Sequence, residues 1–250
     1  MTGEDTSFEQ LAAVEAESPT LIEGLPGHGL VAAIAVDLIT EQLELDHYGN
    51  VASEKFPPVV TFENGLVQDL VRVYAGSDPA VMTLESDLAL PPAAFEPLSR
   101  CVLEELAADF GRAIFLAGAP AGSEEELGEV TGVATTPGLK EDLEAAGIAV
   151  PEEPGVVGGI TGALVRECYQ AEIPAALLIV RAHPRLPDPG AARSVIENAL
   201  EPLVEFEIDT TPLEEQDEQI RQRMQQIAEQ YQGMIEEGDT GQPPATGMFQ

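Results

Sequence analysis

A glycine loop near the start of the chain carries the residues whose spacing could do chemistry. Gly27-His28-Gly29-Leu30-Val31-Ala32 has the Gly-x-Gly-x-x-Ala form of a dinucleotide-binding loop. The apolar pair Leu21-Ile22 precedes the loop, and residues 30–40 are apolar at helical spacing, so the segment predicts a strand, a loop and a helix. Backbone N–H groups at the start of such a helix could hold an anion. Glycines there could equally allow a helix to pack closely on a sheet.

Three features of this loop argue against a nucleotide. Pro26 interrupts the glycines, and the acidic residues that follow, Glu44 and Asp46, fall in the turn before the next predicted strand rather than at a strand end. A phosphate-binding P-loop also needs Lys followed by Ser or Thr, and neither follows these glycines. Gly27, His28 and Gly29 are therefore a candidate anion loop, with structural packing as the competing interpretation.

The other reactive residue types do not form a catalytic or metal-binding pattern. His28, His47 and His183 lie far apart in the sequence, and none has a Cys or His partner at metal-ligand spacing. His183 follows a predicted strand and could line a pocket, but a histidine satisfied within its loop is the simpler interpretation. Cys101 and Cys168 are single cysteines in predicted helices, which favours a reducing cytoplasm over a disulfide framework. We therefore expect no metal, no cofactor and no catalytic residue.

The charge of the chain is far from average, with 45 Asp and Glu against 11 Lys and Arg and a formal net charge of −34. Such a chain repels nucleic acid. The acidic residues are scattered, which favours a general adaptation to concentrated salt, as in a halophilic organism, over one acidic binding face. The most apolar run, residues 30–39, is too short to cross a membrane and contains Asp37. The acidic N-terminus is not a signal peptide, so we expect a cytoplasmic protein.

Strand and helix patterns alternate over residues 19–210, which implies an α/β/α sandwich with a central, largely parallel or mixed sheet. Asn64-Gly65 predicts a hairpin turn, and Asp188-Pro189 predicts a helix start. Residues 1–18 are expected to be a flexible lead-in with at most a short helix or edge segment. Further strands are predicted over residues 47–51, 58–62, 66–74, 79–84, 113–117, 130–136 and 175–180, and helices over 91–110, 137–146, 160–171 and 189–203.

From residue 211 the pattern changes to that of a helix with a narrow apolar seam, which is typical of a helix that faces another helix. Helix 211–237 is followed by a polar segment, 238–250, which is expected to be flexible and ends in Met248-Phe249-Gln250. Apolar and aromatic side chains at the end of a polar tail suggest docking into a partner's pocket, with an accidental sequence end as the alternative. The seam residues are Leu213, Ile220, Met224, Ile227, Tyr231 and Met234.

Five short segments occur in order along the chain: Gly24-Leu25-Pro26-Gly27-His28-Gly29-Leu30-Val31, Ser53-Glu54-Lys55-Phe56-Pro57-Pro58, Gly132-Val133-Ala134-Thr135, Gly159-Ile160-Thr161-Gly162, and Leu186-Pro187-Asp188-Pro189 with Ala191-Ala192. Together they resemble the archaeal branch of the PAC2 family of proteasome assembly chaperones, over about residues 20–215. The resemblance implies a fold similar to that of nucleoside phosphorylases, without established catalysis. One departure is the loop after Gly118, where relatives carry a second glycine and a tyrosine and this chain has Ala119-Pro120; any pocket function of that loop is therefore not carried over.

The resemblance also implies a homo-oligomer that binds proteasome α subunits. The helix around Ile220 and Met224 could join copies of this chain to each other or to a paralogue, and the sequence leaves both alternatives open. The C-terminal Met248-Phe249-Gln250 looks like the hydrophobic, tyrosine, any-residue tail with which proteasome activators dock between α subunits, with Phe in place of Tyr. Met248 and Phe249 would fill a pocket while the carboxylate of Gln250 pairs with a basic group. We therefore predict a non-enzymatic proteasome assembly chaperone or α-ring-binding factor. The alternative is a nucleoside-phosphorylase-like ligand-binding protein or hydrolase that uses the Gly24–Gly29 loop as an anion site.

Overall fold

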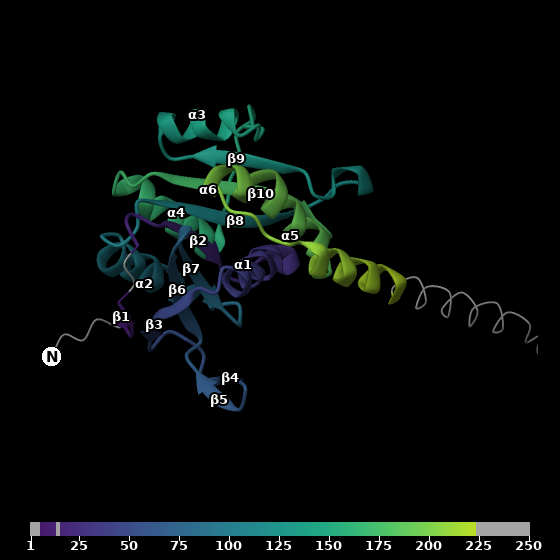
Figure 1. Cartoon of the computed structure of the whole chain (residues 1–250). Coiled ribbons are helices and arrows are strands. Elements are labelled where there is room, and N and C mark those ends of the chain that lie inside the picture. Colours follow the sequence, from purple (N-terminus) through teal and green to yellow (C-terminus); the bar gives the residue numbers. More distant parts are fainter. Residues whose placement is uncertain (1–5, 14–15, 224–250) are drawn as a thin grey trace, which may run out of the picture.

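Strands and helices occur along the chain in the order that the apolar pattern predicts, with successive strands over residues 46–86. The computed structural model describes residues 6–13 and 16–223 (Figure 1). The strands are β1 (Thr6–Gln10), β2 (Thr20–Gly24), β3 (Asp46–Ser53), β4 (Thr61–Glu63), β5 (Leu66–Gln68), β6 (Val71–Ser77), β7 (Ala80–Ser86), β8 (Arg112–Pro120), β9 (Val130–Ala134) and β10 (Ala175–Ala182). The helices are α1 (Val31–Gln42), α2 (Phe95–Cys101), α3 (Pro137–Ala145), α4 (Gly159–Gln170), α5 (Pro189–Val195) and α6 (Glu201–Val204), with π-helical turns extending α2 over Val102–Leu106 and joining α5 to α6 over Ile196–Leu200. A further helix covers 211–223.

The described residues contain an eight-stranded sheet in the order β1-β3-β6-β7-β2-β8-β10-β9. The four central strands, β7, β2, β8 and β10, pair in parallel, and the pairs outside them are antiparallel. The expected α/β fold is confirmed, with a mixed sheet whose centre alone is parallel. Parallel strands are buried on both faces, which explains why residues 113–116 and 175–178 read as continuous apolar runs.

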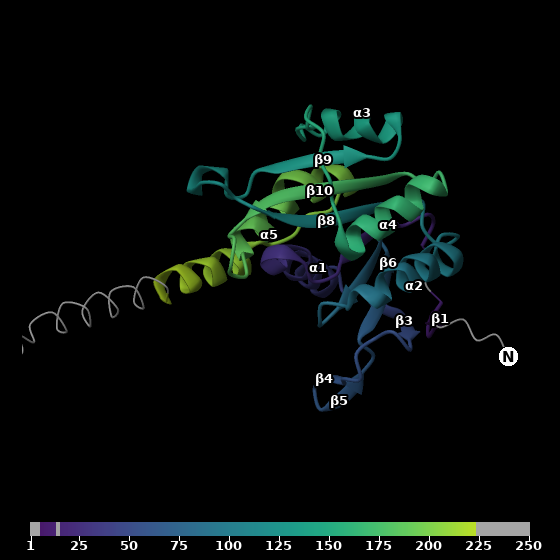
Figure 2. The same ribbon diagram turned by 180° about the vertical axis from the view of Figure 1, so that it is seen from behind.

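Helices cover both faces of this sheet and complete the α/β/α sandwich. Helices α1, α5 and α6 belong to one core, whereas α2 and α4 belong to the other, and Figures 1 and 2 show the two layers from opposite sides. Successive side chains of a strand point to opposite faces, so Ile22 enters the first core and Leu21 the second. Both side chains are fully buried. Strand β2 therefore lies at the centre of the domain.

The lead-in expected to be flexible contains an ordered strand. Strand β1 pairs antiparallel with β3 at the edge of the sheet. The Phe8 ring lies against Tyr48 with 5.6 Å between ring centroids, and the Thr6 and Ser53 hydroxyl oxygens are 2.6 Å apart. Residues 6–10 therefore form the edge segment that the prediction allowed, and Phe8 holds it through a long-range contact that the local pattern of polar and acidic residues does not reveal.

The hairpin turn at Asn64-Gly65 is confirmed, although the strands beside it are shorter than predicted. Asn64 and Gly65 both have positive φ, of 49° and 81°, and they connect Glu63 directly to its cross-strand partner Leu66. The predicted strand over 66–74 divides into β5 and β6, and residues 58–60 precede β4. As a result β4 and β5 form a separate two-stranded sheet, which stands away from the body of the domain (Figure 1).

The predicted helix start at Asp188-Pro189 is confirmed. The Asp188 carboxylate accepts a hydrogen bond from the backbone N–H of Ala191 at 2.9 Å, and Pro189 occupies the first turn of α5. The apolar side chains on the inner face of this helix and its continuation are buried; they are Ala192, Val195, Ile196, Ala199 and Leu203. Among the described residues, no helix is both long and apolar enough to span a membrane.

Candidate functional site

The glycine loop connects β2 to α1 and is pressed against the neighbouring strand β8. A Cβ atom added to Gly118 of β8 would lie 2.1 Å from the backbone oxygen of His28, so the loop needs a glycine opposite it. Gly29 has a positive φ of 65°, and Leu30, which precedes α1, has a left-handed conformation with φ 51°. This close approach supports the packing interpretation of the glycines.

The most perturbed acidic group of this region is one that the sequence reasoning missed. Glu23 lies near the carboxyl end of the central strand β2 and is completely buried. Its carboxyl oxygens lie 3.2 Å from the backbone N of Leu25, 3.3 Å from that of Leu116 and 3.4 Å from the Thr161 hydroxyl of α4. The sequence does carry one sign of this site, because an acidic residue directly follows the apolar pair Leu21-Ile22 within a predicted strand.

Burial raises the pKa of Glu23 from its ordinary value of 4.5 to about 8, and the hydrogen bonds from Leu116, Leu25 and Thr161 oppose part of that rise. The carboxyl group is therefore mainly protonated at neutral pH. Because its side chain has no exposed surface, it cannot reach a substrate in this conformation. Glu23 therefore links β2, β8 and α4 as a buried polar junction.

An acidic groove lies beside the glycine loop, between α1 and the ends of β2 and β7. Its volume is about 490 Å³, and Leu30 and Leu88, with exposed fractions of 40% and 43%, contribute apolar walls. Asp37, Glu85 and Asp87 line it together with a single guanidinium, that of Arg72, and further apolar residues.

Arg72 is already engaged within this groove. Its two terminal nitrogens lie 2.6 Å and 2.9 Å from the carboxylate oxygens of Asp87, and this bidentate pair lowers the pKa of Asp87. Burial raises the pKa of Glu85, whose carboxylate accepts hydrogen bonds from the Thr40 and Thr83 hydroxyls. Three carboxyl groups around one engaged guanidinium disfavour an anion, so the groove does not support the anion-loop interpretation of Gly27, His28 and Gly29.

The three histidines have different hydrogen-bond surroundings. The His47 Nε2 lies 2.7 Å from the Asn50 Oδ1, and the His183 Nδ1 accepts a hydrogen bond from the backbone N–H of Arg185, which is the satisfied loop histidine expected. The Nε2 of His28 is buried without a hydrogen-bond partner. Across the described residues, no group of His, Cys, Asp and Glu has the arrangement of a metal site.

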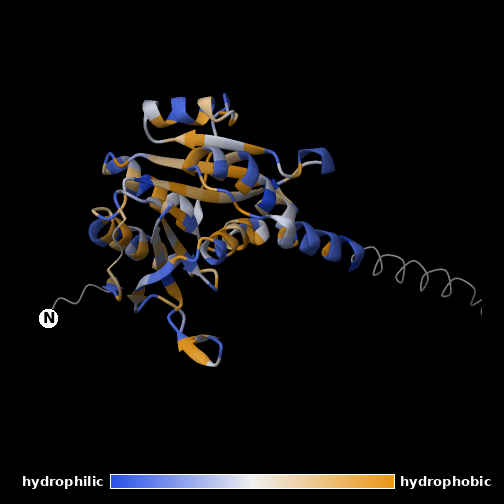
Figure 3. Ribbon diagram, viewed as in Figure 1, coloured by the Kyte–Doolittle hydropathy of each residue, from blue (hydrophilic) through white to orange (hydrophobic). Residues whose placement is uncertain are grey.

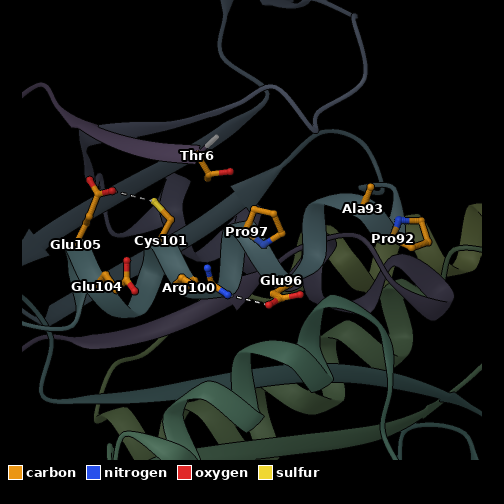
Figure 4. Close-up of a pocket in the computed structure, with 9 residues that line it drawn as sticks. All are labelled: Thr6, Pro92, Ala93, Glu96, Pro97, Arg100, Cys101, Glu104 and Glu105. Carbon is orange, nitrogen blue, oxygen red and sulfur yellow. Dashed lines mark hydrogen bonds and ion pairs between the residues drawn. The ribbon is translucent and has the colours of Figure 1, made fainter. Parts of the chain in front are cut away.

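A second hollow, of about 500 Å³, lies where β1 meets the helix over 92–106 (Figure 4). Three of its charged side chains already have partners: the Arg100 guanidinium lies 2.8 Å from Glu96, and Glu105 accepts a hydrogen bond from the backbone N–H of Phe8 at 2.9 Å. Glu105 also lies 3.6 Å from the Cys101 sulfur. The hydrogen bond between Phe8 and Glu105 therefore holds the edge strand β1 in place. The residues that line this hollow present no arrangement for catalysis.

The helix that begins at residue 211 starts on the domain and then leaves it (Figure 1). The side chain of Leu213 is 2% exposed and belongs to the core of the domain, so it cannot contact a partner helix. Ile220, the next predicted seam residue, is half-buried. An ion pair between Arg193 of α5 and Glu214, at 3.5 Å, holds the start of this helix. The other seam residues, Met224, Ile227, Tyr231 and Met234, and the C-terminal Met248, Phe249 and Gln250 lie outside the described residues.

Comparison with known proteins places the whole domain in one group of proteins. The uncharacterized protein MJ0106 of Methanocaldococcus jannaschii is 29% identical over 229 residues, which cover 91% of this chain and 93% of that protein. The fold is similar to that of Pyrococcus furiosus PbaA, an archaeal homolog of proteasome-assembly chaperone, with a TM-score of 0.80 and 24% identity over 93% of this chain and 96% of that one.

Pyrococcus furiosus PbaB, an archaeal proteasome activator, has the same fold, with a TM-score of 0.80 and 20% identity over 90% of this chain and all of that chain. The model of the PAC2 family matches residues 21–228, which include the glycine loop, the buried Glu23 and the start of the last helix. The chain belongs to the PAC2 family.

Proposed function

We propose that this protein is a non-enzymatic proteasome assembly chaperone or α-ring-binding factor that acts as a homo-oligomer. The observation that carries the proposal is its similarity over nearly the full length of both chains to PbaA, an archaeal homolog of proteasome-assembly chaperone, and to PbaB, an archaeal proteasome activator. Membership of the PAC2 family over residues 21–228 supports the same function.

The chemistry of the domain supports a binding role over a catalytic one. Its most perturbed carboxyl group, that of Glu23, is closed off in the core. Burial raises the pKa of the Cys168 thiol to about 12, which suppresses the thiolate that a nucleophile needs. The groove beside the glycine loop is acidic, which opposes phosphate and nucleotide ligands.

We propose that the C-terminal residues Met248, Phe249 and Gln250 make the contact with the proteasome. Met248 and Phe249 are the large apolar side chains of the otherwise mainly polar segment 238–250, and Gln250 follows them. An apolar pocket between two α subunits would receive the side chains of Met248 and Phe249, and polar groups at its rim would contact Gln250. Several such ends on one oligomer would raise the overall affinity without stronger single contacts.

A capture experiment with purified proteasome α subunits in molar KCl tests this function. We expect the full-length protein to capture the α subunits and a variant lacking Met248 to Gln250 to lose at least tenfold in affinity. Phe249→Tyr is the matched control, and we expect it to bind at least as tightly as the parent because it adds the hydroxyl of the family motif. Failure of the full-length protein to bind α subunits would contradict the proposal.

A further inference from the structure

The hairpin of β4 and β5 exposes an unusual amount of apolar surface. Within this hairpin arm, residues 59–68, the side chains of Phe62 and Val67 are 75% and 71% exposed. Val59, Val60 and Leu66 are exposed as well. In Figure 3 the arm extends away from the body of the domain and carries orange, apolar stretches beside blue, polar ones. Isolated exposed apolar side chains are ordinary, but a contiguous group of them marks an interaction surface.

The register of the hairpin gathers its polar contacts and leaves an apolar pair opposite them. Phe62 and Val67 are directly paired across the two strands, so their side chains lie on the same face. On the other face, the Thr61 hydroxyl donates to the backbone oxygen of Gln68 at 3.2 Å, and the Gln68 amide donates to Glu63 at 2.8 Å. The arm is therefore two-sided: Phe62 and Val67 form an apolar face without a charged group, and Leu66 lies on the other face with Glu63.

The rest of the described chain does not cover this apolar face. Strands β4 and β5 contact each other, and within the described residues neither makes an extensive contact with another helix or strand. A two-stranded sheet with strands of three residues gains little stability from its own pairing and normally needs a further strand or a packed face. The arm therefore has the properties of a surface that is completed by another molecule.

Charge indicates which molecule this is. Residues 59–68 contain one acid, Glu63, and no basic residue, although the whole chain has a net charge of −34. A basic partner would be recognised by carboxylates, which are abundant elsewhere on this chain and scarce here. A second copy carries the same negative charge, so the two copies can approach most closely through a face without carboxylates. Concentrated salt screens the remaining repulsion and strengthens apolar burial.

We propose that the hairpin arm is a self-association surface, at which Phe62 and Val67 of one copy pack against a second copy of this chain. A face that is apolar and uncharged is complementary to itself, as a two-fold contact between identical chains requires. The open edges of β4 and β5 can add backbone hydrogen bonds between copies. This inference rests on the homo-oligomer of the proposed function and names the surface that forms it.

The mass of the full-length protein in molar KCl, measured by light scattering after gel filtration at several concentrations, tests the proposal. We expect the double variant Phe62→Glu, Val67→Glu to associate at least tenfold more weakly than the parent. Val156→Glu is the matched control, because Val156 is 97% exposed and lies outside the arm. Circular dichroism should show both variants folded, since none of these side chains is in the core.

The outcomes separate this inference from the proposed function. A parent that is monomeric throughout, or a double variant with the mass of the parent, overturns the self-association surface. A double variant that keeps its mass but no longer captures α subunits also overturns it, and assigns the arm to the proteasome instead. Loss of α-subunit capture by the full-length parent would contradict the proposed function while leaving the mass measurement intact.

Discussion

Glu23 in strand β2 and Phe62 in strand β4 occupy opposite kinds of environment, and each is the reverse of what its side chain favours in isolation. Glu23 is an acid with no exposed surface, whereas Phe62 is an aromatic residue that is 75% exposed. The acid is held by three hydrogen-bond donors from three parts of the chain. Phe62 lies on an arm without an extensive contact to another described element.

The difference shows that a buried acid and an exposed apolar side chain are stabilised in different ways. A buried carboxyl group is satisfied within the same chain by hydrogen bonds and by holding its proton, so its effect appears in stability. An exposed apolar face is relieved only when something covers it, so its effect appears in association. Changes at Glu23 should therefore alter unfolding, and changes at Phe62 should alter assembly.

The largest expected effect comes from Glu23→Gln, as a change in the pH dependence of stability. The folded state holds the Glu23 proton up to about pH 8, whereas an ordinary glutamate releases it near 4.5. Stability should therefore fall as pH rises from about 4.5 to 8, by up to roughly 5 kcal/mol for a pKa difference of this size. Gln cannot ionise, so the unfolding free energy of the variant, measured in urea, should increase relative to that of the parent as pH rises over that interval.

The pH dependence, and not the absolute stability, tests whether Glu23 is a buried protonated acid. Gln also alters the hydrogen bonds with Leu25 and Leu116, but the free energy of that change does not vary with pH. The exposed Glu63 of the hairpin arm provides the matched control, and Glu63→Gln should leave the pH dependence as in the parent. A stability difference between Glu23→Gln and the parent that stays constant from pH 4.5 to 9 would contradict the buried-acid interpretation.

A smaller effect is expected from removing apolar side chains in the two regions. Ile22→Ala should cost about 3 kcal/mol of unfolding free energy, because Ile22 is fully buried and its removal leaves a cavity. Phe62→Ala should cost less than about 0.5 kcal/mol of unfolding free energy in the monomeric protein, because the Phe62 side chain is exposed.

Urea unfolding at decreasing protein concentration measures both values, since any contribution from association disappears on dilution. A large loss at Phe62 that persists on dilution would mean that the arm is part of the folding core.

An effect smaller than that of Ile22→Ala is expected at two helix N-caps, Asp188 and Thr136, which lie at opposite ends of the sheet. Asp188→Ala should cost about 2 kcal/mol, because the carboxylate caps α5 at Ala191 and also accepts from the backbone N–H of His183 at 2.6 Å. Thr136→Ala removes only one neutral cap, the bond from Leu139 at 3.3 Å, and should cost about 1 kcal/mol. Thermal melts of both variants rank them, and an equal or larger loss at Thr136 would contradict the double role of Asp188.

Much of the fold could be predicted because its signals are local. The helix start at Asp188-Pro189 and the turn at Asn64-Gly65 depend on the conformational preferences of those residues, and both are confirmed. The central strands are apolar because they are buried on both faces, so their runs are visible without knowing their neighbours. The edge strand β1 could not be predicted in this way, because Phe8 finds its partner Tyr48 forty positions later along the chain.

The candidate site shows the same division. The glycine loop is conspicuous in the sequence, yet the groove beside it is acidic because Glu85 and Asp87 at the end of β7 meet Asp37 of α1, and no spacing rule joins those residues. Leu213 matches a helical seam by its spacing, but it enters the domain core because the first turn of its helix rests on the domain.

The sequence by itself determined the alternation of strands and helices, the acidic character of the chain and the resemblance to a family, since composition, periodicity and short motifs are properties of neighbouring residues. Only the tertiary structure decided that Glu23 is enclosed and that Phe62 and Val67 are exposed. Burial is a property of what surrounds a side chain, and those surroundings come from segments that are far apart in the sequence.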